Sequence, residues 1–234
     1  MILWLCSNHR MNVPEQRKES WGCLQWGVVV LVLVLAVIYL LPYRHMISHI
    51  SDQTKAANNC RQIIVALKIW ASDNNGVFPD TGTPPPTSSN QVFRKLIRDG
   101  IVKDERIFGG TNSPFLPDSE LGNAPDYPRS LEPGENHWAM LAGLKIDNDG
   151  THPQIFENTS NSQRPPRWLV NQTQPVRGRT WKSGRIIVGR LDNSVNSEQL
   201  VERNGALTLP GSVLNPNGNE AILPIRILDI EEKK

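Results

Sequence analysis

Few side chains in this 234-residue chain have the types and spacing that catalysis requires. The stretch Glu135-Asn136-His137-Trp138 places a histidine near an acidic residue, as in a general base with a partner that orients it. No nucleophile stands near it in a recognised elbow or motif. We therefore expect His137 to pack or to anchor a loop, and we expect no catalytic residues; a hydrolase acting through His137 is the least favoured function.

Oxygen-bearing side chains are dense in Asp147-Asn148-Asp149-Gly150, which resembles part of a calcium loop. If Gly150 takes the sixth position of an EF-hand loop, Lys145 and Phe156 fall at the two end positions, where neither can ligate calcium. A polar turn is the expected structure. Asp147 and Asp149 remain weak calcium candidates, and no other metal or cofactor is predicted.

Two further sets of potential ligands favour structural roles. His45 and His49 are one helical turn apart but lack the spacing of a metalloprotease helix, so a polar helix face is expected. Cys60 is the only cysteine after residue 43, which excludes a disulfide within residues 44–234. At helical spacing, Cys60 is expected to be a small core residue.

Composition excludes one class of partner. The chain has 25 basic and 23 acidic residues, and neither sign forms a long block. We therefore expect no nucleic-acid partner. Trp168 and Trp181 flank the basic stretch Arg177-Gly178-Arg179 and are expected to be core residues, with a partner-binding surface as the alternative.

An uncharged run from Trp21 to Tyr43 suggests how the chain is anchored. As a helix its 23 residues would reach about 34 Å, enough for a bilayer core of about 30 Å. The run is longer than the apolar core of a signal peptide and ends on Leu-Leu-Pro-Tyr, which disfavours a removable signal. The prediction is a cytoplasmic leader (1–20), a transmembrane helix in contact with membrane lipid (21–43) and an extracytoplasmic domain (44–234), in a single-pass inner-membrane protein.

Apolar residues continue at three- and four-residue steps after the run, which predicts an amphipathic helix over residues 44–75 that ends at Gly76. Residues 81–100 predict a loop and a short helix, Gln91 to Arg98, capped by Ser88, Ser89 or Asn90. Residues 101–234 predict a loop-rich β region. Its expected elements are loops over 109–134, a brief strand or turn over 138–144, a hairpin over 185–195 and an edge strand over 221–230.

This order resembles the type IV pilin and type II secretion pseudopilin superfamily. The resemblance lies in Trp21 to Asp80: an apolar helix with Pro42 about midway, then Asn59-Cys60-Arg61-Gln62-Ile63 and the ending Phe78-Pro79. It implies an α+β fold in which a long N-terminal helix, half transmembrane and half amphipathic, packs on a small antiparallel β-sheet with long loops. It also implies other pilin-like subunits or secretion-system proteins as partners.

Two positions depart from the prepilin pattern. Ser20 replaces the glycine that precedes the cleavage point, so Trp21 would be the first mature residue of a diverged processing site. Gln25 replaces the glutamate that the family uses in assembly. We expect the leader to be retained, with either Met1 or Met11 as the start. The departures favour a non-polymerising pilin-like protein or one placed at a filament tip.

The expected function is thus that of a non-enzymatic, membrane-anchored pilin-like or pseudopilin protein, a minor component of a type II secretion or type IV pilus-like assembly. The alternative from another class is a membrane-anchored extracytoplasmic domain that binds a ligand or serves as an adaptor.

Overall fold

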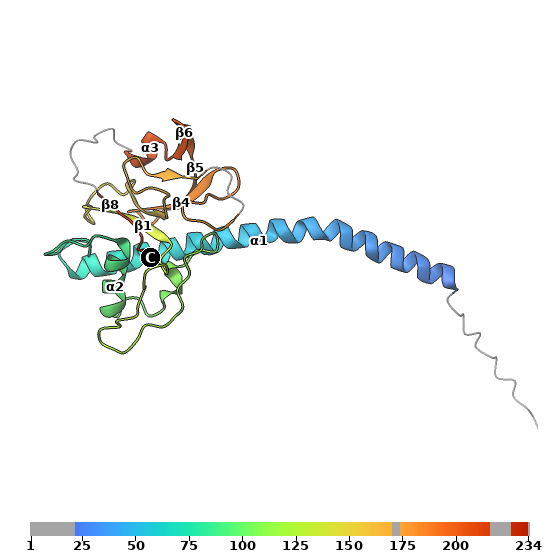
Figure 1. Cartoon of the computed structure of the whole chain (residues 1–234), viewed down its shortest axis with the longest axis horizontal. Helices are drawn as coiled ribbons and strands as arrows, with labels where there is room; N and C mark the ends of the chain where they lie inside the picture. Colours follow the sequence, from blue (N-terminus) through green and yellow to red (C-terminus); the bar gives the residue numbers. More distant parts are fainter. Residues whose placement is uncertain (1–21, 170–173, 216–225, 234) are drawn as a thin grey trace, which may run out of the picture. The chain divides into compact units, whose positions relative to one another are not determined.

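The computed structural model describes residues 22–169, 174–215 and 226–233 (Figure 1). Its helical elements are α1 (Cys23–Asp73), α2 (Ser89–Arg98), the 3-10 helix η1 (Glu105–Phe108) and α3 (Gly211–Leu214). Its strands are β1 (Trp138–Ala142), β2 (Pro153–Glu157), β3 (Arg167–Trp168), β4 (Arg185–Arg190), β5 (Val195–Gln199), β6 (Val201–Arg203), β7 (Ala206–Thr208) and β8 (Arg226–Leu228).

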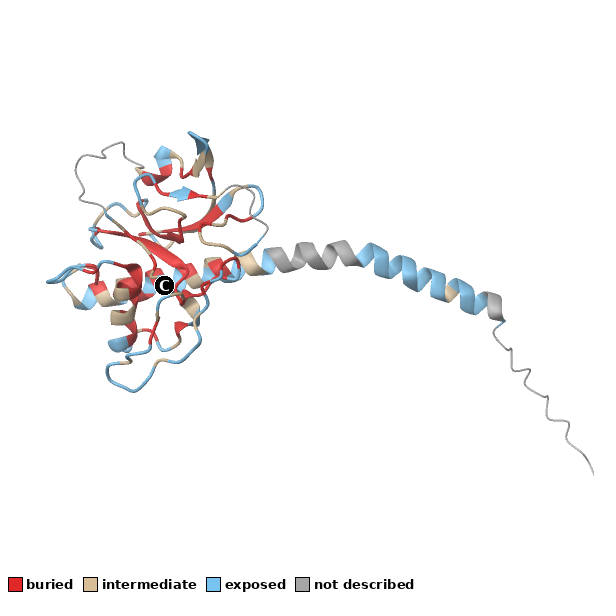
Figure 2. Cartoon of the chain, in the orientation of Figure 1, coloured by how far each residue is buried: buried red, intermediate tan, exposed pale blue. Residues whose placement is uncertain are grey.

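The chain divides into two compact units, residues 1–47 and residues 48–234, and α1 contributes to both. In the first unit, the side chains described between Gln25 and Leu40 are exposed except for the half-buried Val29 (Figure 2). In the second unit, α1 buries one stripe in the core, formed by Ala56, Cys60, Ile63, Ile64, Leu67 and Ala71. The helix ends where Gly76, in the left-handed region at φ 75°, donates its N–H to the Ala71 carbonyl at 2.8 Å, as predicted.

The predicted transmembrane segment is wrong. A spanning helix needs about 20 consecutive, predominantly apolar residues. Within the residues that the structure describes, no helix has both the length and the apolar character to cross a bilayer. This finding overturns the partly transmembrane fold, the single-pass and prepilin assignments, and the inner-membrane localisation.

The fold is α+β with two antiparallel sheets rather than one small sheet. The larger has the strand order β5-β4-β2-β1-β8 and the smaller the order β3-β7-β6. All five residues of β1 and all five of β2 are buried. In the neighbouring strand β4, the four central residues are buried and the two end residues are not. Burial of successive residues, which point to opposite faces, means that both faces of the central strands are covered.

A glycine sets how closely α1 approaches the larger sheet. A Cβ added at Gly189 of β4 would lie 2.4 Å from Ile64 Cδ1 and 2.6 Å from Cys60 Sγ. Both of these side chains belong to the buried stripe of α1. The absence of a side chain at Gly189 is therefore what lets the helix lie on the strand. Elsewhere on this sheet, Phe156 of β2 meets Trp168 of β3 edge to face, with ring centroids 6.0 Å apart.

Helix α2 begins at Ser89, two residues before the predicted start at Gln91. Ser88, one of the three predicted caps, accepts a hydrogen bond from the Gln91 N–H at 3.2 Å. The buried face of α2 includes Phe93, which stacks on Phe108 of η1 with centroids 4.8 Å apart. The long connection from η1 to β1 contains no strand among its described residues, as predicted for residues 109–134.

The predicted hairpin is confirmed as β4 and β5, which pair from Arg185 with Gln199 to Gly189 with Val195. Its turn includes Asn193 at φ 70°, a conformation that asparagine tolerates better than most residues. Of the predicted strand over 221–230, Arg226–Leu228 forms β8 at the edge of the larger sheet, whereas residues 221–225 lie outside the described residues.

Candidate functional site

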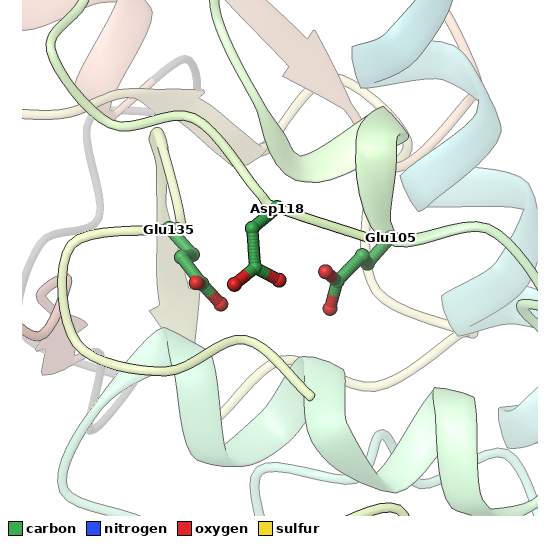
Figure 3. A group of neighbouring side chains, drawn as sticks. All are labelled: Glu105, Asp118 and Glu135. Carbon is green, nitrogen blue, oxygen red and sulfur yellow. The ribbon is translucent and has the colours of Figure 1, made fainter. Parts of the chain in front are cut away.

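Three carboxylates from the connection between α2 and β1 converge (Figure 3). Glu105 begins η1, Asp118 lies in the following loop and Glu135 precedes β1. One oxygen from each lies within 4.8 Å of the others. Glu105 and Glu135 are buried, and Asp118 is exposed. Of the described residues, these are the only ones that bring three acidic, histidine or cysteine ligand atoms together in this way.

Most of these oxygens already accept hydrogen bonds from the loop that they enclose. The carboxylate of Glu105 accepts the N–H of Ser119 at 2.7 Å and that of Leu131 at 3.0 Å. The carboxylate of Glu135 accepts the N–H of Glu132 at 2.7 Å. Glu105 therefore connects two distant points of a loop that has little regular structure, and buried backbone donors are satisfied by it.

Within this cluster, the charges and burial change the pKa of Glu135. Burial raises the pKa of Glu135, and the negative charges of Asp118, Glu105 and Glu132 raise the pKa further. Carboxylate oxygens are the ligands that Ca²⁺ and Mg²⁺ prefer. The backbone hydrogen bonds hold the side chains of Glu105 and Glu135 in place without an ion. The structural role of the cluster is therefore to tie the loop between η1 and β1 together.

His137 is buried in a second polar network rather than placed in an open site. The Asn158 amide donates to His137 Nδ1 at 2.8 Å, which leaves the ring proton on Nε2 to donate to Glu157 at 3.1 Å. Glu157 also accepts the indole N–H of Trp181 and the backbone N–H of Ile187, both at 2.9 Å. His137 and Glu157 are 1% and 0% exposed.

This network agrees with the predicted packing role of His137. A Cβ added at Gly110 would lie 2.4 Å from the imidazole ring, so backbone closes over that side of the histidine. Both ring nitrogens are engaged, and His137 is not among the residues that line the pockets beside α1, α2, Asp80 and Arg164. Asn158 is buried in the same network, and Trp168 and Trp181 are buried, as expected of core residues.

Cys60 is a core residue, as predicted. It is fully buried, and burial raises the pKa of its thiol well above 9.0, with the charge of Glu157 adding to the effect. Both effects disfavour a reactive thiolate.

The predicted calcium candidates lie apart from the acidic cluster. Asp149 accepts the N–H and the hydroxyl of Thr151 at 2.8 and 2.7 Å, and Lys145 donates its N–H to Asn148 at 2.7 Å. These are the bonds of the polar turn that the sequence predicts. Asp147 and Asp149 belong to no group of three converging ligands among the described residues.

The predicted assembly position, Gln25, lies in the first turn of α1. Its side-chain oxygen accepts the Gly22 N–H at 3.1 Å, which is one of the two bonds of a capping box. Ser20 and Trp21, the predicted processing positions, lie outside the described residues, as do the side chains of His45 and His49.

An apolar groove follows the exposed side of α1 in the second unit. It has a volume of about 630 Å³ and lies between α1 and the segment that leads into η1. Val65 and Ile69 are 40% and 48% exposed along it, and Ile101 and Ile107 form part of the opposite wall. Contiguous apolar surface of this kind is a candidate for contact with another molecule.

Sequence reasoning missed the acidic cluster and Glu157. The three clustered carboxylates are 13 and 17 positions apart along a glycine- and proline-rich chain, where no periodicity links them. Glu157 follows two apolar residues, Ile155 and Phe156. A charged residue at the end of an apolar stretch was the one signal in the sequence that could have indicated a buried carboxylate.

Comparison with protein-family models, with curated proteins and with solved structures gives no match to this chain.

Proposed function

We propose that this chain is a non-enzymatic structural protein, a pilin-like or pseudopilin-like subunit that assembles with other subunits through helix α1. The proposal combines the resemblance carried by residues 21–80 with the surface of the helix. Its partners would be other pilin-like subunits or proteins of a secretion system.

The observation on which the proposal depends is the exposure of large apolar side chains in the first unit. Trp26, Leu33 and Tyr39 are 59%, 59% and 66% exposed, and the valines, leucines and isoleucine between them are similarly exposed apart from the half-buried Val29. Each aliphatic side chain of this size would gain about 1.5–3 kcal/mol on full burial. A row of them on one helix is therefore a strong drive for association with another apolar surface.

The polar networks of the second unit support a non-enzymatic role. The polar partners of His137 and Glu157 are bonded to each other and to the backbone in the core. General acid–base catalysis requires such groups to reach a substrate, which this burial prevents.

Site-specific photo-crosslinking of the full chain tests the proposal. A photoreactive residue at Ile50, which is 55% exposed on α1, should yield covalent dimers or heteromeric products. The same residue at the exposed Glu202 of β6 is the matched control and should yield far fewer.

A charge substitution provides an independent measurement. Leu33→Glu, which adds a charge to the exposed apolar surface, should abolish the crosslinks from Ile50, whereas Lys182→Glu at an exposed position of the second unit should leave them. Equal crosslinking from Ile50 and Glu202 would contradict assembly through α1. Crosslinks from Ile50 that are unaffected by Leu33→Glu would also contradict it.

A further inference from the structure

A second pocket is lined by the side of α2 that faces away from the core. It shares no lining residue with the apolar groove and none with the acidic cluster. It has a volume of about 480 Å³ and is bounded by α2, the loop over residues 81–86 and the loop over residues 126–130. Pockets of a few hundred Å³ hold one or two rings of a small molecule. Nothing in the assembly proposal uses this pocket.

Three cationic side chains of α2 line the pocket, and they are held differently. Arg94 forms a 2.6 Å ion pair with Glu231 and donates to the carbonyls of Ser130 and Leu131, so its charge is compensated and its position is set. Arg94 therefore supports the wall of the pocket rather than offering a free charge.

Lys95 and Arg98 supply the charge that is available to a ligand. The Lys95 ammonium lies 4.8 Å from the centre of the Trp70 ring and has one long hydrogen bond, 3.5 Å, to the Pro79 carbonyl. An ammonium has three N–H donors, so at least one remains for a ligand. The side chain of Arg98 is exposed and has no ion-pair or hydrogen-bond partner among the described residues.

The remaining lining residues suit a hydroxylated ring. Tyr127 and Pro128 are among the lining residues and carry apolar rings, and the only acidic residue in the lining, Asp126, can accept hydrogen bonds from hydroxyl groups. Tyr127 is held at φ 44°, a conformation uncommon for an aromatic residue, and the Ser130 hydroxyl donates to its carbonyl at 2.8 Å. Backbone strain of this kind is often found at ligand sites.

We propose that this pocket binds a small acidic sugar, whose carboxylate or phosphate pairs with Lys95 and Arg98 and whose ring lies against Tyr127. The two cations favour an oxyanion, Asp126 favours hydroxyl groups on the same ligand, and the ring surfaces favour a cyclic one. A simple inorganic anion would satisfy only the first of these three features.

Isothermal titration of the full chain with four probes tests the proposal: galacturonate, glucose 1-phosphate, neutral galactose and inorganic phosphate. Binding of one or both acidic sugars, with dissociation constants of about 1 mM or lower, is expected. Galactose and inorganic phosphate should each bind about tenfold more weakly, because each lacks one set of contacts.

Variants then locate the binding. Arg98→Gln should weaken binding of the acidic sugar about tenfold, and since Arg98 is exposed the fold should be unaffected. Lys103→Gln, which removes an exposed cation from the wall of the apolar groove, is the matched control and should change nothing. Because Trp70 contacts Lys95, ligand binding should also shift tryptophan emission, and Trp70→Phe should remove that shift.

The proposal is overturned if neither acidic sugar binds, if galactose or inorganic phosphate binds as tightly as the acidic sugars, or if Arg98→Gln and Lys103→Gln behave alike. None of these results depends on crosslinking through α1, so this pocket and the assembly function succeed or fail separately.

Discussion

At the scale of single residues, buried carboxylates organise this protein. Glu157 sits in the core and is surrounded by N–H donors from a histidine, a tryptophan and the backbone. Glu105 joins two points of a long loop in the same manner. Such groups are stabilised when every oxygen is bonded, and they are costly when one partner is lost.

Glu157→Gln should therefore lower the free energy of unfolding by about 1–3 kcal/mol. The substitution replaces one acceptor oxygen with an NH₂ group that would face the N–H donors of Trp181 and Ile187. Urea denaturation provides the measurement, and Glu202→Gln at an exposed site should be neutral. A neutral result for Glu157→Gln would mean that the network contributes little to stability.

Glu135 predicts a pH dependence. Because its pKa in the folded protein is raised above the usual 4.5, the folded state binds this proton more tightly than the unfolded chain does. The contribution of Glu135 therefore favours folding below pH 4.5 and is lost as the pH rises through the folded-state pKa.

Glu135→Gln should accordingly raise the free energy of unfolding at pH 7 by about 1 kcal/mol, while still accepting the Glu132 N–H. The gain should disappear near pH 4, where the carboxyl is protonated in both states. Thermal unfolding from about pH 4 to 8 measures this difference. If added Ca²⁺ instead raises the melting temperature of the wild type and not of Glu135→Gln, the cluster binds metal and the loop-closing role is incomplete.

At the scale of elements, the contact between α1 and β4 depends on the missing side chain of Gly189. Strand β4 has little freedom to shift away from α1, because it is hydrogen-bonded to β2 on one side and to β5 on the other. Small-to-large changes in such well-packed interiors are destabilising.

Gly189→Ala should cost about 1–3 kcal/mol of stability, since its Cβ would lie 2.4 Å from Ile64 Cδ1. Adding Ile64→Val, which removes that Cδ1, should recover part of the loss in a double-mutant cycle. Gly211→Ala is the control, because the nearest heavy atom would be 3.9 Å away. Additive effects of Gly189→Ala and Ile64→Val would argue against direct contact.

At the scale of the whole molecule, the two units have different characters. The described side chains of the first unit are almost all exposed, whereas the second unit contains the hydrophobic core and both sheets. Stability should therefore belong to the second unit, and association to the first.

A chain of residues 48–234 should keep its cooperative thermal unfolding, with a midpoint within about 2–4 °C of the full chain, because the hydrophobic core lies within it. The same truncation should remove self-association, measured by sedimentation velocity. Loss of cooperative unfolding would place part of the folding energy in residues 1–47.

Local signals in the sequence determined several elements correctly. Ser88, the apolar spacing of α2, the Gly76 stop of α1 and the Asp192-Asn193 turn act within a few residues of one another. The buried roles of Cys60 and His137 also followed from their surroundings in the chain. Each depends on chemistry that a short segment already contains.

Tertiary structure alone decided the rest. Hydropathy predicted a membrane span that the described helices do not provide, and it could not indicate two sheets in place of one. The meeting of Glu105, Asp118 and Glu135, and the pocket beside Lys95 and Arg98, arise where loops without periodicity return to α2 and η1. Contacts between residues far apart in sequence depend on how the loops close, and no repeating pattern along the chain records that.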